Sequence, residues 1–166
     1  MSAHETASAG ARQEHVTDER ALALLGVPAG QGRVLLAHAE AQALLFICSR
    51  FAVRLAPRLA ELALHSLLLF HGSTRPWLDR WDAFDASGYV AWLCAQNAIH
   101  PAAVSELYRA WRAALAFSVE QRILRPHEAD AVFAALCGLE HPLLVLSMNG
   151  HRSVTLHEED CDAPHA

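Results

Sequence analysis

The chain has 166 residues, 53% of them hydrophobic and 19% charged, which is long and apolar enough for one domain with a sizeable core. The formal net charge of −5, with the histidines neutral, excludes a general electrostatic attraction to nucleic acid, so DNA contact would need a local group of arginines. All 13 basic residues are arginine, and the lack of lysine excludes P-loop nucleotide binding and Schiff-base chemistry.

The N-terminal residues 1–15 are small and polar and have no apolar period, so they predict a disordered arm. A single helical domain is expected over residues 16–157. It starts with a short helix that Thr17 caps and that Gly26 and Pro28 end.

The most apolar part of the chain follows, with one helix expected from about Arg33 to Arg54 and a second one after Pro57. Pro57 either separates two helices or kinks one, because proline lacks a backbone donor and crowds the preceding turn. Apolar residues cover more than one face of these helices, and both faces must be buried. Residues 34–71 are therefore either core throughout or in part the seam of a homodimer.

Aromatic residues gather in a short helix that Ser73 or Thr74 is expected to cap. Its stripe consists of Trp77, Leu78, Trp81 and Phe84. Such a stripe is either part of the core or, if it is exposed, a patch that binds a protein partner.

Residues 85–125 read as a short helix, a tight turn at residues 97–100 and a long helix that Pro101 opens. Small or apolar residues fall where two such helices touch, namely at Leu93, Cys94, Ala98, Ile99, Val104 and Leu107. On these residues the stretch resembles the helix-turn-helix superfamily over residues 90–110, without pointing to one family. Asn97 departs from the pattern, which has an apolar residue there, and His100 stands where Ser or Thr is the usual N-cap.

The resemblance implies a DNA-binding transcriptional regulator whose second helix approaches the bases. The apolar stripe of this helix is Val104, Leu107, Tyr108, Trp111 and Leu115. On the other side, Ala102, Ser105 and Glu106 stand where base edges would be approached, and phosphate contacts would come from Arg109, Arg112, Arg122 and Arg125. Few of these side chains can read bases, so the alternative is a buried helix pair with a structural role only.

A further helix is expected after Pro126, with Gly138 past its end. The runs PLLVLSM and HRSVTLH then flank Asn149-Gly150, the pair typical of a type I′ turn, and predict a small C-terminal β-hairpin. Residues 158–166 are acidic and predict a disordered tail.

A helix followed by a hairpin also resembles the end of a winged helix-turn-helix domain. In that second register the recognition helix would contain Ala129–Leu136, and His151 and Arg152 would lie at the wing. Glu128 and Asp130 oppose this register, because acids at a helix N-terminus repel phosphate.

The titratable residues contain one candidate set of metal ligands, drawn from two helices that are expected to face each other. The set consists of Glu61, His65 and His71 with His38 or Glu40. The sequence lacks the repeated Glu-x-x-His pairs of a di-iron bundle, and no nucleophile with its base follows from residue spacing. We therefore expect no metal site, no cofactor and no enzymatic activity.

The cysteines form no Cys-x-x-Cys pair and lie far apart, at Cys48, Cys94, Cys137 and Cys161. Three of them stand in apolar helical stretches, as free thiols do, which indicates a reducing cytoplasm. No signal peptide is expected, and no apolar run reaches the ~20 residues that a membrane span needs.

Together these patterns predict a mainly α, single-domain helical bundle of about five to seven helices with a small C-terminal β-hairpin. The predicted function is DNA binding by a cytoplasmic transcriptional regulator. We expect it to act as a homodimer, because a helix face with few base-reading side chains gains its affinity from paired half-sites. The alternative is a non-enzymatic interaction protein, meaning an adaptor, chaperone or assembly subunit, that holds a protein partner through apolar and aromatic helical surface.

Overall fold

The computed structural model of the protein describes residues 22–159 apart from residues 24, 75–79 and 97–98, with side chains as far as Asn149. In that part the chain is mainly helical and contains no strand, which confirms the predicted helical class. The helices are α2 (Ala29–Ile47), α3 (Pro57–Thr74), α4 (Ala86–Gln96), the 3₁₀ helix η1 (Pro101–Ala103), α5 (Val104–Glu120), α6 (Pro126–Cys137) and α7 (Glu140–Glu159). The predicted N-terminal arm, most of the helix expected after Thr17, and residues 160–166 of the tail lie outside the described residues.

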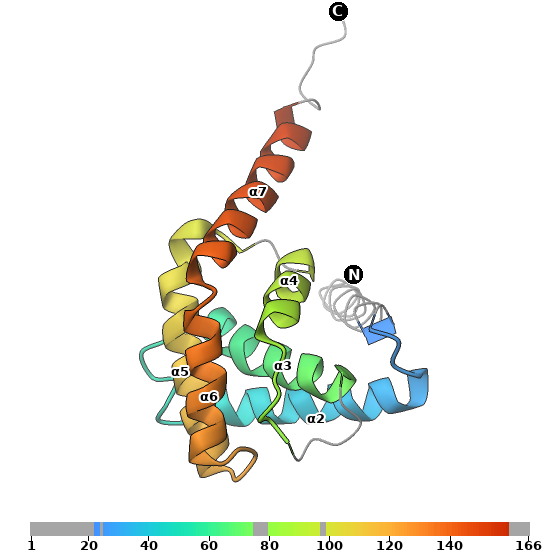
Figure 1. Ribbon diagram of the computed structural model, residues 1–166, viewed down its shortest axis with the longest axis vertical. Coiled ribbons are helices and arrows are strands. Elements are labelled where there is room, and N and C mark those ends of the chain that lie inside the picture. The colour runs from blue at the N-terminus through green and yellow to red at the C-terminus, as the bar shows by residue number, and fades with distance from the viewer. Residues whose placement is uncertain (1–21, 24, 75–79, 97–98, 160–166) are drawn as a thin grey trace, which may run out of the picture.

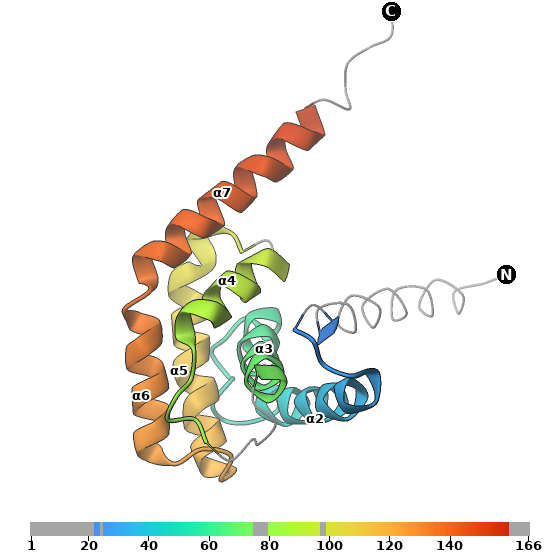
Figure 2. The same cartoon turned by 45° about the vertical axis from the view of Figure 1, so that its right-hand side comes forward.

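The helices α2 and α3 form an antiparallel pair (Figures 1 and 2). Pro57 is the first residue of α3, so it separates two helices, at a position where its missing N–H is no loss. The first helix ends at Ile47, before the expected Arg54, and the Ser49 hydroxyl donates to the carbonyl of Phe46 just beyond that end. Buried alanines let the two backbones approach closely, and they are Ala39, Ala43, Ala60 and Ala63.

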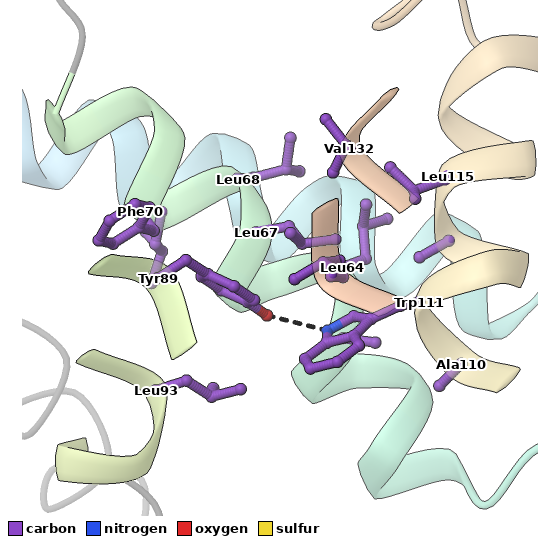
Figure 3. Close-up of a cluster of buried hydrophobic side chains, with 14 of the residues drawn as sticks. Leu64, Leu67, Leu68, Phe70, Tyr89, Leu93, Ala110, Trp111, Leu115 and Val132 are labelled. Carbon is purple, nitrogen blue, oxygen red and sulfur yellow. Dashed lines mark hydrogen bonds between the residues drawn. The ribbon is translucent and has the colours of Figure 1, made fainter. Parts of the chain in front are cut away.

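The long helix α5 packs on α3 and on α6, and its buried face follows the predicted helical period. Four of the five predicted stripe residues, Val104, Leu107, Trp111 and Leu115, are at most 3% exposed, and the fifth, Tyr108, is half-buried. Leucines of α3 meet this face from the opposite side (Figure 3). The expected apolar stripe is therefore confirmed as core.

The buried hydroxyl of Tyr89 joins α3, α4 and α5 (Figure 3). Its oxygen accepts a hydrogen bond from Trp111 Nε1 at 2.9 Å and lies 2.8 Å from Ser66 Oγ. Since Ser66 Oγ itself donates to the carbonyl of Leu62, the Tyr89 hydroxyl donates to Ser66. Each donor of this buried chain thus has an acceptor, as a low-dielectric interior requires. Burial also raises the pKa of the Tyr89 hydroxyl, because the phenolate would be desolvated there.

Gly138 caps the C-terminus of α6, as predicted, and the chain then enters α7. A second tyrosine secures this end of α6, because the Tyr108 hydroxyl donates to the carbonyl of Leu136 at 2.7 Å. None of the described helices is by itself long and apolar enough to cross a bilayer, whereas α6 with the first part of α7, bent by 54°, together meet that criterion of length and composition.

Helix α7 runs through the segment for which the sequence predicted a β-hairpin. Residues 142–148, the expected first strand, are helical, with Leu143 and Ser147 buried one turn apart. The run PLLVLSM is apolar throughout, so it suits a helical face as well as a strand, and Pro142 is tolerated in a first helical turn. The described residues of this run are therefore helical, while the C-terminal hairpin as a whole stays a prediction. The side chains of the second strand lie outside the described residues.

The Tyr89 hydrogen bonds predict that Tyr89→Phe is more destabilising than Tyr108→Phe. The first change leaves the buried Trp111 N–H without an acceptor, at a cost of about 1–3 kcal/mol in the free energy of unfolding. The second removes one half-exposed hydrogen bond, worth about 0.5–1.5 kcal/mol. Urea denaturation of the two variants beside the unaltered chain makes the comparison, and equal losses would contradict the assigned role of Tyr89.

Gly150→Ala decides between the helix and the hairpin at the C-terminal end. Inside a helix, alanine in place of glycine stabilises by about 1 kcal/mol and raises helical content. In a type I′ turn the same position needs a positive φ, which alanine adopts only with strain. We expect increased ellipticity at the helical minima and a higher melting temperature. A loss of stability would favour the hairpin.

Candidate functional site

The residues that the helix-turn-helix resemblance placed toward DNA follow one line along η1 and α5. Ala102, Ser105 and Arg109 are exposed, and Arg112 continues the line one turn further. These side chains share a face because they are three or four residues apart. The structure thus brings together four of the seven predicted DNA contacts on one side of one helix.

His100 is the N-cap of η1, the short 3₁₀ helix that leads into α5. His100 Nδ1 accepts a hydrogen bond from the backbone N–H of Ala102 at 3.2 Å. His100 therefore fills the N-cap role that the common pattern gives to Ser or Thr. Asn97 and Ala98, which belong to the same predicted turn, lie outside the described residues.

Glu106 is half-buried and contributes to the fold rather than to the exposed line. Its Oε1 accepts a hydrogen bond from the backbone N–H of Ala56 at 3.3 Å, directly before α3 begins. A carboxylate at a helix N-terminus satisfies an otherwise unpaired donor and interacts favourably with the helix dipole. Glu106 thus ties α5 to the start of α3. Fifty residues separate the two partners, so no local sequence signal could have found this contact.

Two contacts border the exposed line of α5. On one side the guanidinium of Arg112 lies 5.9 Å from the ring centre of Phe133 on α6. On the other side Glu120 forms an ion pair with Arg50, in the segment between α2 and α3. These two contacts flank the second half of α5, whereas Ala102 in η1 and Ser105 and Arg109 in the first half of α5 lie exposed.

The last two predicted arginines lie in the connection between α5 and α6. Arg122 and Arg125 are both exposed, and Arg122 adopts a left-handed backbone with φ 60° where α5 ends. Arg109 is thirteen residues before Arg122, which corresponds to about 20 Å along a helix. The acids Glu120 and Asp130 are exposed in the same region. The four arginines are thus spread out and mixed with negative charge.

A groove with a volume of about 460 Å³ lies between α5 and α6. Its walls are mostly apolar, with Arg112 and Asp130 as the charged members. The helix that the winged register assigned to base reading forms one wall, and its Ala129, Val132 and Leu136 are buried. That register therefore places the apolar stripe of its recognition helix in the core.

The described half of the predicted aromatic patch belongs to the core. Trp81 is 2% exposed and stacks on His71 with 3.8 Å between ring centres. Phe84 is half-buried and packs edge-on against Phe70 at 6.0 Å. The segment around Trp81 is not helical, although a short helix was expected. Trp77 and Leu78 lie outside the described residues.

Glu128 is a buried carboxylate whose role the sequence did not reveal. Its Oε2 accepts the N–H of Arg125 at 2.8 Å, and its Oε1 accepts the N–H of Trp81 at 3.4 Å. The first bond caps α6, and the second fixes the Trp81 segment on that helix end. An acid in the first turn was the visible signal, but its partner across the fold was not.

The outer face of α2 carries exposed apolar side chains. Val34, Leu44 and Leu45 are 73%, 64% and 55% exposed, and Val53 after the helix reaches 79%. The opposite face of α2, including Leu36 and Phe46, is buried against the rest of the protein. The two apolar faces noted in the sequence therefore have different environments, since one is core and the other meets solvent.

The histidine and acid group proposed for a metal does not assemble in the part of the chain that is described. In that part no three His, Cys, Asp or Glu side chains lie close enough to hold an ion. Glu61 is exposed and His65 is half-buried on α3. No protein-family model, no curated protein and no solved structure matches this chain.

Proposed function

We propose that the protein is a cytoplasmic, non-enzymatic interaction protein that binds a protein partner through the outer face of α2. The observation that carries this proposal is the exposure of Val34, Leu44 and Leu45 on a helix whose other face is already core. Contiguous apolar surface on a folded chain is typical of sites for protein partners. In the described part of the predicted aromatic patch, Trp81 is buried and Phe84 is half-buried, so these two residues do not form an exposed patch.

The exposed side chains supply part of the free energy of binding. Complete burial of a Val or Leu side chain stabilises by about 1.5–3 kcal/mol relative to its exposed state. Three such residues therefore contribute several kcal/mol, against which stands the loss of translational and rotational freedom on association. The rest must come from shape complementarity and from the other residues that the partner covers.

DNA binding by a helix-turn-helix regulator is the second candidate function. It is favoured by the exposure of all four predicted arginines, Arg109, Arg112, Arg122 and Arg125. Against it stand the net charge of −5 and the use of Glu106 as a contact to α3. We therefore rank DNA binding below partner binding.

A pull-down from lysate of the native cell, with and without nuclease, separates the two candidates. We expect the tagged chain to retain a protein partner, which includes an untagged copy of the chain, regardless of nuclease. Leu44→Glu should abolish retention, because it places an unpaired charge at the centre of the apolar face. The matched control Val145→Glu changes another exposed apolar residue, on α7, and should retain the partner.

DNA binding predicts a different result in the same pull-down. It requires loss of retention on nuclease treatment, and a mobility shift of DNA that weakens steeply with salt. Arg109→Ala and Arg112→Ala should then reduce binding to all sequences while changing stability by less than about 0.5 kcal/mol, because both side chains are exposed. That outcome, with Leu44→Glu unaffected, would replace partner binding with DNA binding.

A further inference from the structure

Six exposed residues along α2 and at its C-cap fall on the spacing of a coiled-coil seam. They are Gly30, Val34, Ala37, Ala41, Leu44 and the C-cap Cys48, at intervals of four, three, four, three and four residues. A helix that repeats its contact residues every 3.5 positions presents them in one straight line to a second helix. Helix α3 lies on the other side of α2 (Figures 1 and 2), so this line faces outward. We call these six residues the α2 seam.

The chemistry of the α2 seam selects an apolar helix as its complement. None of the six residues is charged, and all are small or aliphatic apart from the thiol of Cys48. The flanking Leu45 is 55% exposed and extends the apolar surface on one side. An acidic or basic partner surface would therefore lose hydration on this face without gaining an opposite charge.

We propose that the α2 seam pairs with the α2 seam of a second copy of the chain, in antiparallel orientation. This inference rests on the proposed function and names its partner. In that arrangement Ala37 lies opposite Ala41 on both sides of the centre, where two small residues let the helices approach closely. Val34 lies opposite Leu44 one turn away on each side, so the largest side chains of the seam flank the point of closest approach.

The ends of the seam complete the antiparallel arrangement. Gly30 lies opposite Cys48 at each end, and the glycine leaves room for the larger thiol side chain. An added Cβ at Gly30 would meet nothing within 4 Å, so this position opens to the outside of the chain. The residue pairs therefore follow in the same order from either end of the seam, so the contact has two-fold symmetry.

A parallel pair does not fit the seam as evenly. It would place Gly30 opposite Gly30 at one end, which leaves a gap that neighbouring side chains do not fill. Leu44 would meet Leu44 toward the other end, so the helices would diverge. Antiparallel pairing also brings the positive end of each helix dipole next to the negative end of the other. Both considerations favour the antiparallel pair.

The length of the seam sets the strength of the association. The eighteen residue steps from Gly30 to Cys48 rise by about 27 Å along a helix. One helical seam of this length is smaller than the ~800 Å² per partner of a standard interface, so we expect a dimer that dissociates at micromolar concentration. Its formation should therefore depend on protein concentration over the range that sedimentation analysis covers.

A charge exchange across the seam tests the pairing with the purified full chain. In sedimentation over a concentration series, Val34→Glu and Leu44→Lys should each weaken dimerisation by more than about tenfold, because each leaves unpaired charges in the seam. The double variant should recover dimerisation, because each new carboxylate then lies opposite a new ammonium group. Within one chain these sites are ten residues and about 15 Å apart, too far for an ion pair.

The salt dependence of dimerisation distinguishes the double variant from the unaltered chain. The dimer of the double variant should weaken as salt is added, because its ion pairs are screened, whereas the apolar seam of the unaltered chain should not weaken. Val145→Glu serves as the control outside the seam and should leave dimerisation unchanged. Circular dichroism verifies that each variant is folded, which the exposure of both substituted sites favours.

Two results would overturn the pairing. One is an unaltered chain that sediments as a monomer at every concentration. The other is a folded double variant that dimerises no better than the single variants, which would indicate parallel pairing or another surface. If the chain is monomeric but Leu44→Glu still abolishes retention of a different protein from lysate, the proposed function stands and the inference of self-pairing fails. If Leu44→Glu changes neither dimerisation nor the retention of a partner, both the proposed function and the inference of self-pairing fail.

Discussion

The hydroxyl of Tyr89 is the point on which the arrangement of the central helices depends. It accepts a hydrogen bond from Trp111 on α5 and donates one to Ser66 on α3. Tyr89 itself belongs to α4, and its side chain is fully buried. Three helices that are distant in sequence are thus fixed by one chain of buried hydrogen bonds, whose partners cannot be exchanged for water. This constraint orients α5 so that Trp111 faces the core.

The orientation of α5 determines which surfaces remain for function. With Trp111 inward, the exposed line through Ser105, Arg109 and Arg112 is bordered by α6 on one side and by the segment before α3 on the other. Glu106 is held at the start of α3. Of the residues predicted to approach base edges, Glu106 is thus a contact between α5 and the start of α3, whereas Ala102 and Ser105 remain exposed. Exposed apolar side chains lie instead on α2, at Val34, Leu44 and Leu45, and to a smaller exposed fraction on α7.

The sequence predicted those features that depend on local pattern. The buried stripe of α5 follows from its 3.6-residue period, and the start of α3 at Pro57 follows from the backbone chemistry of proline. Contacts between distant segments, such as Glu106 with Ala56 and Glu128 with Trp81, leave no periodic signal. The same limit applies to residues 142–148, because an all-apolar run fits a helix or a strand and its sequence pattern alone does not distinguish them. The exposed face of α2 was visible only as an excess of apolar residues.

The central claim is that the outer face of α2 is the binding surface and that a second copy of the chain covers it. Amide hydrogen exchange of the purified chain at low and high protein concentration tests this most directly. The account predicts that amides of α2 exchange more slowly at high concentration, because pairing suppresses the opening of that helix, while those of α6 are unchanged. Exchange in α2 that is independent of concentration, or protection that appears in α5 or α6 instead, would contradict it.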